Sequence, residues 1–239
     1  MHESAWGRLI AVLVSPARTF ESIAARPTWV APLIVLMVLS TAAYALAWQR
    51  VDVDQMKRET SAAMERRGQP ANEEQLEQIA GVQKGFGMGC SVVIPPIAYL
   101  LSALVLMAGF KLAGGEIGFK TSFSVTLHGM MPWAIAALLL LPVVLAQEAV
   151  DFKALQAQTL LASSAAAFLP ADASPVLVAL VGSIDVFSFW SIALLIIGFA
   201  IAARVSRGPA ATTVILAWLF WIAVKVALAW AGSAFGGAG

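Results

Sequence analysis

SIDVFSFWSIALLIIGFAIAARVSR, residues 183–207, is the stretch that decides the fold. It is long and apolar enough to cross a bilayer, because about 20 apolar residues in a helix span the hydrocarbon core. The stretch also carries one carboxylate, Asp185, near its start. An ionisable group in hydrocarbon costs several kcal/mol unless it is paired, so Asp185 is the first candidate functional residue.

The composition of the chain indicates a membrane protein. Of its 239 residues, 60% are hydrophobic and only 12% are charged, whereas a soluble domain has about 25% charged residues. The formal net charge of +1 provides no basic field of the kind that attracts nucleic acid, and we expect no nucleic-acid partner. We therefore predict an all-α fold, a polytopic integral membrane helical bundle.

Five transmembrane helices are predicted within a membrane domain of residues 29–231. They cover approximately residues 29–48, 87–110, 123–146, 175–204 and 209–230. Tryptophans at both ends of the first helix, Trp29 and Trp48, fit the headgroup boundary of a bilayer. In the second helix, Pro95 and Pro96 remove backbone donors and predict a kink.

Two short segments flank the membrane domain. Residues 1–28 are predicted to form an N-terminal interfacial segment with a short amphipathic helix that starts at Ser15-Pro16. Phe20 and Ile23 fall on one face of this helix, and we expect the helix to lie in the membrane interface. Residues 232–239 are small and rich in glycine, so a flexible tail is expected there.

Residues 49–86 form the only long polar segment of the sequence. Its six Lys and Arg residues are interleaved with seven acids, which is typical of a solvated helical hairpin. Asn72 and Gln75 have the spacing of a capping box at the start of the second helix of this hairpin. The segment is too small for a catalytic domain.

No catalytic or metal-binding pattern is evident in the sequence. The chain has two histidines and one cysteine, so Cys90 has no disulfide or metal partner. His128 lies near the start of the third predicted transmembrane helix, where it could serve as a proton relay or a ligand. A hydrogen-bonded packing role fits better because no second ligand is close in sequence. We expect no cofactor, no metal and no enzymatic activity.

Basic residues in the short loops predict the orientation. A cytoplasmic N-terminus places Lys111, Lys120, Arg204 and Arg207 inside and Lys153 outside. Short cytoplasmic loops carry the excess of Lys and Arg, so the N-terminus is predicted to be cytoplasmic and the C-terminus outside.

This orientation places Asp185 and Lys225 at similar depth. Both lie in the outer half of the bilayer, at roughly 9–15 Å for a rise of about 1.5 Å per residue. We hypothesise that they form a polar pair between adjacent helices. The alternatives are that Lys225 extends to the outer headgroups and that Asp185 lies closer to water at a helix start.

Three stretches of the sequence resemble the Ypt-interacting protein (YIP) family in its bacterial five-span form. They are residues 15–35, residues 184–210 and the Trp-rich last helix with Lys225. The most specific part is an Asp-x-Phe-x-x-Trp pattern, continued by a glycine, at Asp185, Phe187, Trp190 and Gly198. The resemblance implies a five-helix membrane protein with a cytosolic N-terminus.

The resemblance also implies a role without catalysis. Eukaryotic members interact with small Rab-type GTPases and act in vesicle traffic and membrane shaping. Their Asp-Leu-Tyr-Gly-Pro motif is absent here, where residues 26–32 read RPTWVAP, and their Gly-Tyr-Lys-Leu motif is echoed only by GFKL at residues 109–112. These departures argue against a small GTPase as partner.

Two classes of function follow. The first is a non-enzymatic protein of the bacterial inner membrane that organises the membrane or binds a partner. Its contacts would be the lipid bilayer and a protein partner or a second copy of the chain. The alternative is a small transporter or channel subunit that uses Asp185, Lys225 and His128, because buried ionisable groups and proline-broken helices mark many substrate paths.

Overall fold

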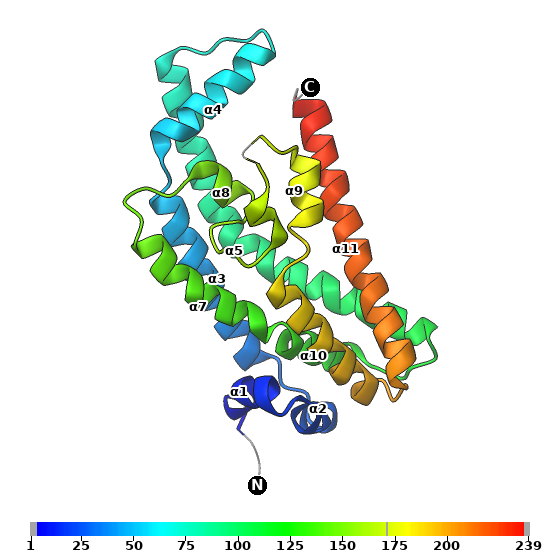
Figure 1. The fold of residues 1–239 in the computed structure, drawn as a ribbon. Coiled ribbons are helices and arrows are strands. Elements are labelled where there is room, and N and C mark those ends of the chain that lie inside the picture. The colour runs from blue at the N-terminus through cyan, green and yellow to red at the C-terminus, as the bar shows by residue number, and fades with distance from the viewer. Residues whose placement is uncertain (1–3, 171, 237–239) are drawn as a thin grey trace. The chain divides into compact units, whose positions relative to one another are not determined.

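The computed structural model describes residues 4–170 and 172–236, and its secondary structure is helical throughout apart from two isolated β-bridges (Figure 1). This confirms the all-α prediction. In chain order the elements are α1 (Gly7–Val14), α2 (Pro16–Ala25), α3 (Val30–Gln49), α4 (Val53–Arg66), α5 (Glu73–Leu112), α6 (Phe119–Gly129), α7 (Met131–Leu145), α8 (Phe152–Gln156), the 3₁₀ helix η1 (Ala165–Phe168), α9 (Pro175–Val181), α10 (Val186–Ala202) and α11 (Arg207–Gly236).

Within the described residues, four segments are long and apolar enough to cross a membrane. They are Val30–Gln49, Glu73–Leu112, Phe119–Leu145 and Arg207–Ser233. The 40-residue α5 joins the second hairpin helix to the second predicted transmembrane helix and continues through Pro95 and Pro96. The last of these helices extends to Gly236, into the predicted tail, whose residues 237–239 lie outside the described part.

The fourth predicted transmembrane helix is interrupted. Residues 175–204 were expected to form one helix, but α9 ends at Val181 and α10 begins at Val186. Gly182 is the C-cap residue of α9, and Asp185 lies in the non-helical link that follows. With 17 residues, α10 is about 25 Å long, close to the thickness of the hydrocarbon core of a bilayer.

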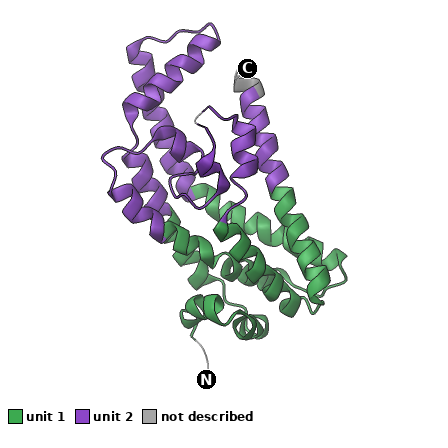
Figure 2. Cartoon of the chain, viewed as in Figure 1, with its two compact units in different colours: residues 1–40, 93–137, 186–221 green, residues 41–92, 138–185, 222–239 purple. Residues whose placement is uncertain are grey.

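The described chain divides into two compact units (Figure 2). Unit 1 comprises Met1–Ser40, Val93–Ala137 and Val186–Trp221, and unit 2 comprises Thr41–Val92, Leu138–Asp185 and Ile222–Gly239. The polar hairpin belongs to unit 2, and the two N-terminal helices belong to unit 1.

The core of unit 1 is built around α2, which packs against α6 and α10. Phe20 and Ile23 are fully buried in this core. The apolar face of α2 therefore packs against protein, and the interfacial position of residues 1–28 stays a prediction. Exposed apolar side chains of this segment include Ile10 and Val14 of α1.

Close helix packing in unit 1 depends on Gly198. A Cβ atom at this position would lie 2.8 Å from carbon atoms of both Phe20 and Val125. Such distances are too short for carbon atoms in contact, so α10 can approach α2 and α6 only with glycine here. Phe199, the next residue, stacks on Phe110 with ring centroids 4.6 Å apart.

Unit 2 holds the polar hairpin in a defined geometry. The predicted capping box is confirmed: the Asn72 amide donates to Gln75 Oε1 at 3.0 Å, and the Gln75 amide donates to Asn72 Oδ1 at 2.9 Å. Lys57 Nζ lies 2.9 Å from Glu73 Oε1, and this hydrogen bond raises the pKa of Lys57. The Arg50 guanidinium donates to the carbonyls of Val144, Leu145 and Gln147 at the end of α7.

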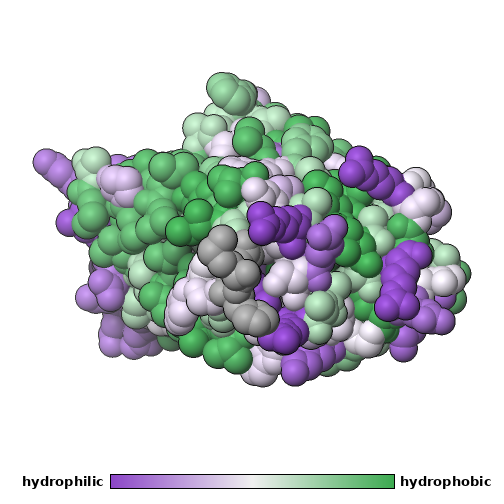
Figure 3. All heavy atoms as spheres, turned by 90° about the horizontal axis from the view of Figure 1, so that it is seen from below, coloured by the Kyte–Doolittle hydropathy of each residue, from purple (hydrophilic) through white to green (hydrophobic). Residues whose placement is uncertain are grey.

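Apolar side chains cover much of the molecular surface. In the most apolar 18-residue stretch of α11 only 6% of the residues are buried, and in that of α5 only 11% are buried. The face in Figure 3 carries broad areas of hydrophobic residues (green), with hydrophilic residues (purple) in separate groups. Soluble proteins rarely expose apolar surface on this scale, so these helices contact lipid.

We predict that Gly198→Ala lowers stability. The new methyl group would force Phe20 or Val125 to move, which typically costs about 1–3 kcal/mol in a packed core. The measurement is the melting temperature of the purified protein in detergent. Gly208→Ala in α11 is the control, because its Cβ meets no atom of the described residues within 4 Å. Equal melting temperatures for both variants would contradict the packing role.

Candidate polar site of unit 2

The break between α9 and α10 positions Asp185 inside unit 2. The link before α10 lies antiparallel to residues 163–165: Ser164 and Asp185 form a β-bridge, and the Ala165 amide donates to the Ile184 carbonyl at 3.0 Å. The side chain of Asp185 is consequently buried, with 4% of its surface exposed. The local fold thus brings residues from two distant parts of the sequence to the carboxylate.

The Asp185 carboxylate accepts a short hydrogen bond within this site. Ser163 Oγ donates to its Oδ2 at 2.5 Å. The charge of Asp185 also interacts electrostatically with Tyr44 of α3 and Lys225 of α11. A hydrogen bond to an ionised group contributes about 1.5–3 kcal/mol, so Ser163 compensates part of the cost of burying the carboxylate.

Lys225 reaches the same site from α11. Its ammonium donates to Ser183 Oγ at 3.0 Å, and the Ser183 hydroxyl donates in turn to the Ala179 carbonyl at 3.0 Å. Lys225 keeps an exposed side on α11 while its ammonium is held by Ser183, which is itself buried. The two members of the hypothesised pair thus lie in one cluster, and a direct Asp185–Lys225 contact stays a prediction.

His128 belongs to unit 1, whereas the residues of the polar cluster belong to unit 2. It is fully buried on α6, and its Nδ1 lies 2.8 Å from the Ser124 carbonyl oxygen, one helical turn earlier. Its Nε2 has no hydrogen-bond partner within the described residues. The structure therefore does not bring His128 together with Asp185 as members of one unit.

The other residues of the family pattern are packing residues of unit 1. The Phe187 ring contacts Trp133 at a centroid distance of 6.1 Å, and Trp190 packs half-buried against the core. Gly198 allows the close approach described above. The pattern therefore contains one carboxylate of unit 2 and three residues of unit 1 that determine how α10 packs.

Sequence reasoning missed Ser163 and Ser183. Ser163 lies in a segment with mixed polar and apolar residues, and nothing in its spacing links it to a residue 22 positions later. Ser183 follows Gly182 at the end of an apolar helix, a place where a serine is unremarkable. The only sequence signal is that a carboxylate in hydrocarbon requires partners of some kind.

The chemistry of this cluster is that of a hydrogen-bonded anchor. It contains a carboxylate, two hydroxyls and an ammonium, which can hold helices in register or bind a small polar group. Among residues 4–170 and 172–236, no group of three His, Cys, Asp or Glu side chains is arranged to hold a metal ion.

The fold and this cluster define a polytopic helical membrane protein. Comparison with known families gives a more specific assignment: a model of the Yip1 domain matches residues 10–239. The chain belongs to the Yip1 domain family, as the resemblance in its fourth transmembrane segment predicted.

One curated relative extends this comparison. The chain is similar to membrane protein YknW of Bacillus subtilis, with 26% identity over 199 residues that cover 83% of this chain and 80% of that protein. No solved structure matches the chain.

We predict an energetic coupling between Asp185 and Lys225. Asp185→Asn and Lys225→Met should each lower stability, and the double variant should lose less than the sum by about 0.5–3 kcal/mol, because the second change removes a charge that has already lost its counterpart. The measurement is the free energy of unfolding in detergent. Lys153→Met combined with Asp185→Asn is the matched control. Its losses should be additive, because Lys153 Nζ pairs with Glu59 at 2.9 Å. Additive losses for Asp185 and Lys225 would contradict the pair.

Proposed function

We propose that this protein is a non-enzymatic membrane protein that organises the membrane or binds a protein partner through its polar hairpin. The observation that carries the proposal is the family match over residues 10–239. The polar cluster supports it, because the hydroxyls of Ser163 and Ser183 bond to Asp185 and Lys225 in the manner of an anchor rather than of a nucleophile and its base.

The hairpin supports a role in partner binding. It is fixed to residues 147–156: the Val150 amide donates to the Arg50 carbonyl at 2.8 Å, and Gln55 Nε2 donates to Asp151 Oδ2 at 2.9 Å. The end of α4 and the start of α5 are nevertheless exposed, including Arg66, Gln69 and Glu74. A supported segment with exposed mixed charges can present a fixed surface to a partner.

We also propose a location in the bacterial inner membrane with the N-terminus in the cytoplasm. The bacterial relative supports the location, and the charge distribution supports the orientation. In the short loops, this orientation has four basic residues inside, Lys111, Lys120, Arg204 and Arg207, and one outside, Lys153. An excess of Lys and Arg on the cytoplasmic side is the usual arrangement.

A transporter or channel subunit is the second candidate. The observation in its favour is the interruption between α9 and α10 with a buried carboxylate in the link, since broken helices with polar groups form the binding sites of many carriers. In this role Asp185 and Lys225 would contact the solute, and His128 would act separately in unit 1.

We predict that the hairpin is accessible from outside and the α5–α6 loop from the cytoplasm. Single cysteines at Gln69 and Ala113, in a background with Cys90→Ala, are exposed positions for these two segments. An impermeant maleimide added to intact spheroplasts should label the cysteine at 69, whereas the cysteine at 113 should react only after lysis. The reverse pattern would refute the orientation.

We predict that the hairpin contacts a partner in cells. A photo-crosslinking residue at Gln69 should give a discrete adduct, which charge reversal at Glu74 should abolish. The same residue at the lipid-facing Val38 is the control. An adduct of twice the monomer mass would identify a second copy of the chain.

The transporter is tested by solute and ion flux in proteoliposomes. Flux that Asp185→Asn abolishes, together with no hairpin adduct, would favour the transporter over the partner-binding function.

A further inference from the structure

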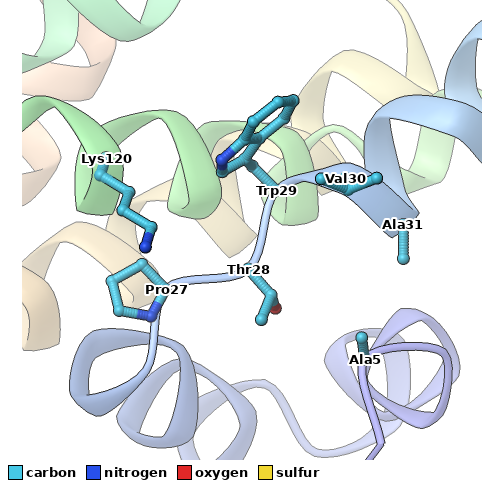
Figure 4. A pocket seen from close by; sticks show the side chains of 7 residues that line it. All are labelled: Ala5, Pro27, Thr28, Trp29, Val30, Ala31 and Lys120. Atoms are coloured by element: carbon cyan, nitrogen blue, oxygen red, sulfur yellow. The ribbon is translucent and has the colours of Figure 1, made fainter.

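A cavity of about 270 Å³ lies in unit 1 beside the start of α3 (Figure 4). Its lining comes from a residue two positions before α1, from the α2–α3 connection, and from the first turns of α3 and α6. The lining residues are Ala5, Pro27, Thr28, Trp29, Val30, Ala31 and Lys120. Because Trp29 and Lys120 both lie where a predicted transmembrane helix begins, the cavity is at headgroup depth.

Two cations are associated with this cavity. Lys120 lines it directly, and Figure 4 shows its side chain extending toward Pro27. Arg8 lies behind it: its Nη1 donates to the Thr28 hydroxyl at 3.1 Å and to the Arg26 carbonyl at 2.9 Å. Thr28 is thus shared between the cavity wall and a buried guanidinium.

Arg8 is a buried charge that lacks a counterion within the described chain. Its exposed fraction is 6%, and its Nε is buried without a hydrogen-bond partner. Two ion pairs of the described residues, Lys57–Glu73 and Lys153–Glu59, lie in unit 2 and include neither Arg8 nor Lys120. A buried cation is costly unless an anion accompanies it, so this region is complementary to a negatively charged group.

The charge of unit 1 strengthens this complementarity. The sequence of unit 1 contains seven basic and three acidic residues. The acidic residues in its described part, Glu21 and Glu116, are exposed and do not line the cavity. Clusters of Lys and Arg at the membrane surface attract anionic lipids.

An exposed apolar track begins at the cavity. Val30 lines the cavity, and Val30, Ile34 and Val38 follow one face of α3 at intervals of four residues with 52%, 46% and 60% of their surfaces exposed. At 1.5 Å per residue this track is about 12 Å long and leads into the hydrocarbon. A ligand with an anionic head and an acyl chain matches both features.

We propose that this cavity binds the headgroup of an anionic phospholipid. The phosphate lies beside Lys120 in the field of Arg8, and one acyl chain follows Val30, Ile34 and Val38. This site is independent of the hairpin and of the partner-binding function proposed above. Its consequence is that the end of the molecule with α1 and α2 selects negatively charged lipid.

The test measures binding of lipid to the purified full-length chain by native mass spectrometry, with phosphatidylglycerol and phosphatidylcholine as probes. We expect preferential binding of phosphatidylglycerol, weakened about fivefold in Lys120→Gln. Ala5→Leu, which fills the cavity and keeps the charge, should also weaken binding. Lys111→Gln is the matched control, because Lys111 is an exposed lysine of unit 1 outside the cavity.

Three outcomes would overturn the proposal. They are equal binding of the two lipids, equal losses in Lys120→Gln and Lys111→Gln, and displacement of phosphatidylglycerol by inorganic phosphate alone at millimolar concentration. Melting temperatures of each variant in detergent establish that it is folded. A folded Ala5→Leu variant with unchanged lipid preference would also count against the cavity as the site.

Discussion

The absence of water in the hydrocarbon core is the constraint on which the rest of this structure depends. Every backbone polar group in a transmembrane segment must find its partner within the chain, and a charged side chain there is costly unless it is paired. Hydroxyls of Ser40 and Ser124 donate to carbonyls one helical turn earlier, so their helices remain intact. An ionised carboxylate cannot donate to a backbone carbonyl in this way. Asp185 lies instead where the helix is interrupted, and there it accepts a hydrogen bond from Ser163.

The transmembrane helices, the hairpin and its capping box were predictable because each has a local signal, either a long apolar run or a fixed spacing of polar residues. Two features lacked such a signal. An apolar face on α2 looks the same whether it meets lipid or protein, and only the fold shows that Phe20 and Ile23 enter a core. The partners of Asp185 were out of reach because their proximity arises from a β-bridge between distant segments.

The family pattern combines two physical roles in one stretch. Asp185 belongs to the polar cluster of unit 2, whereas Phe187, Trp190 and Gly198 govern how α10 packs in unit 1. The same 14 residues therefore carry both the polar anchor and the close helix contact.

The unequal charges of the two units have a consequence for insertion into an energised membrane. In the proposed orientation the segments that must cross the membrane belong to unit 2, where eleven acids exceed eight bases. A membrane potential that is negative inside assists outward movement of net negative charge, at about 2.3 kcal/mol per elementary charge and 100 mV. The bacterial proton-motive force would then help to fix the topology of this protein while it is being made.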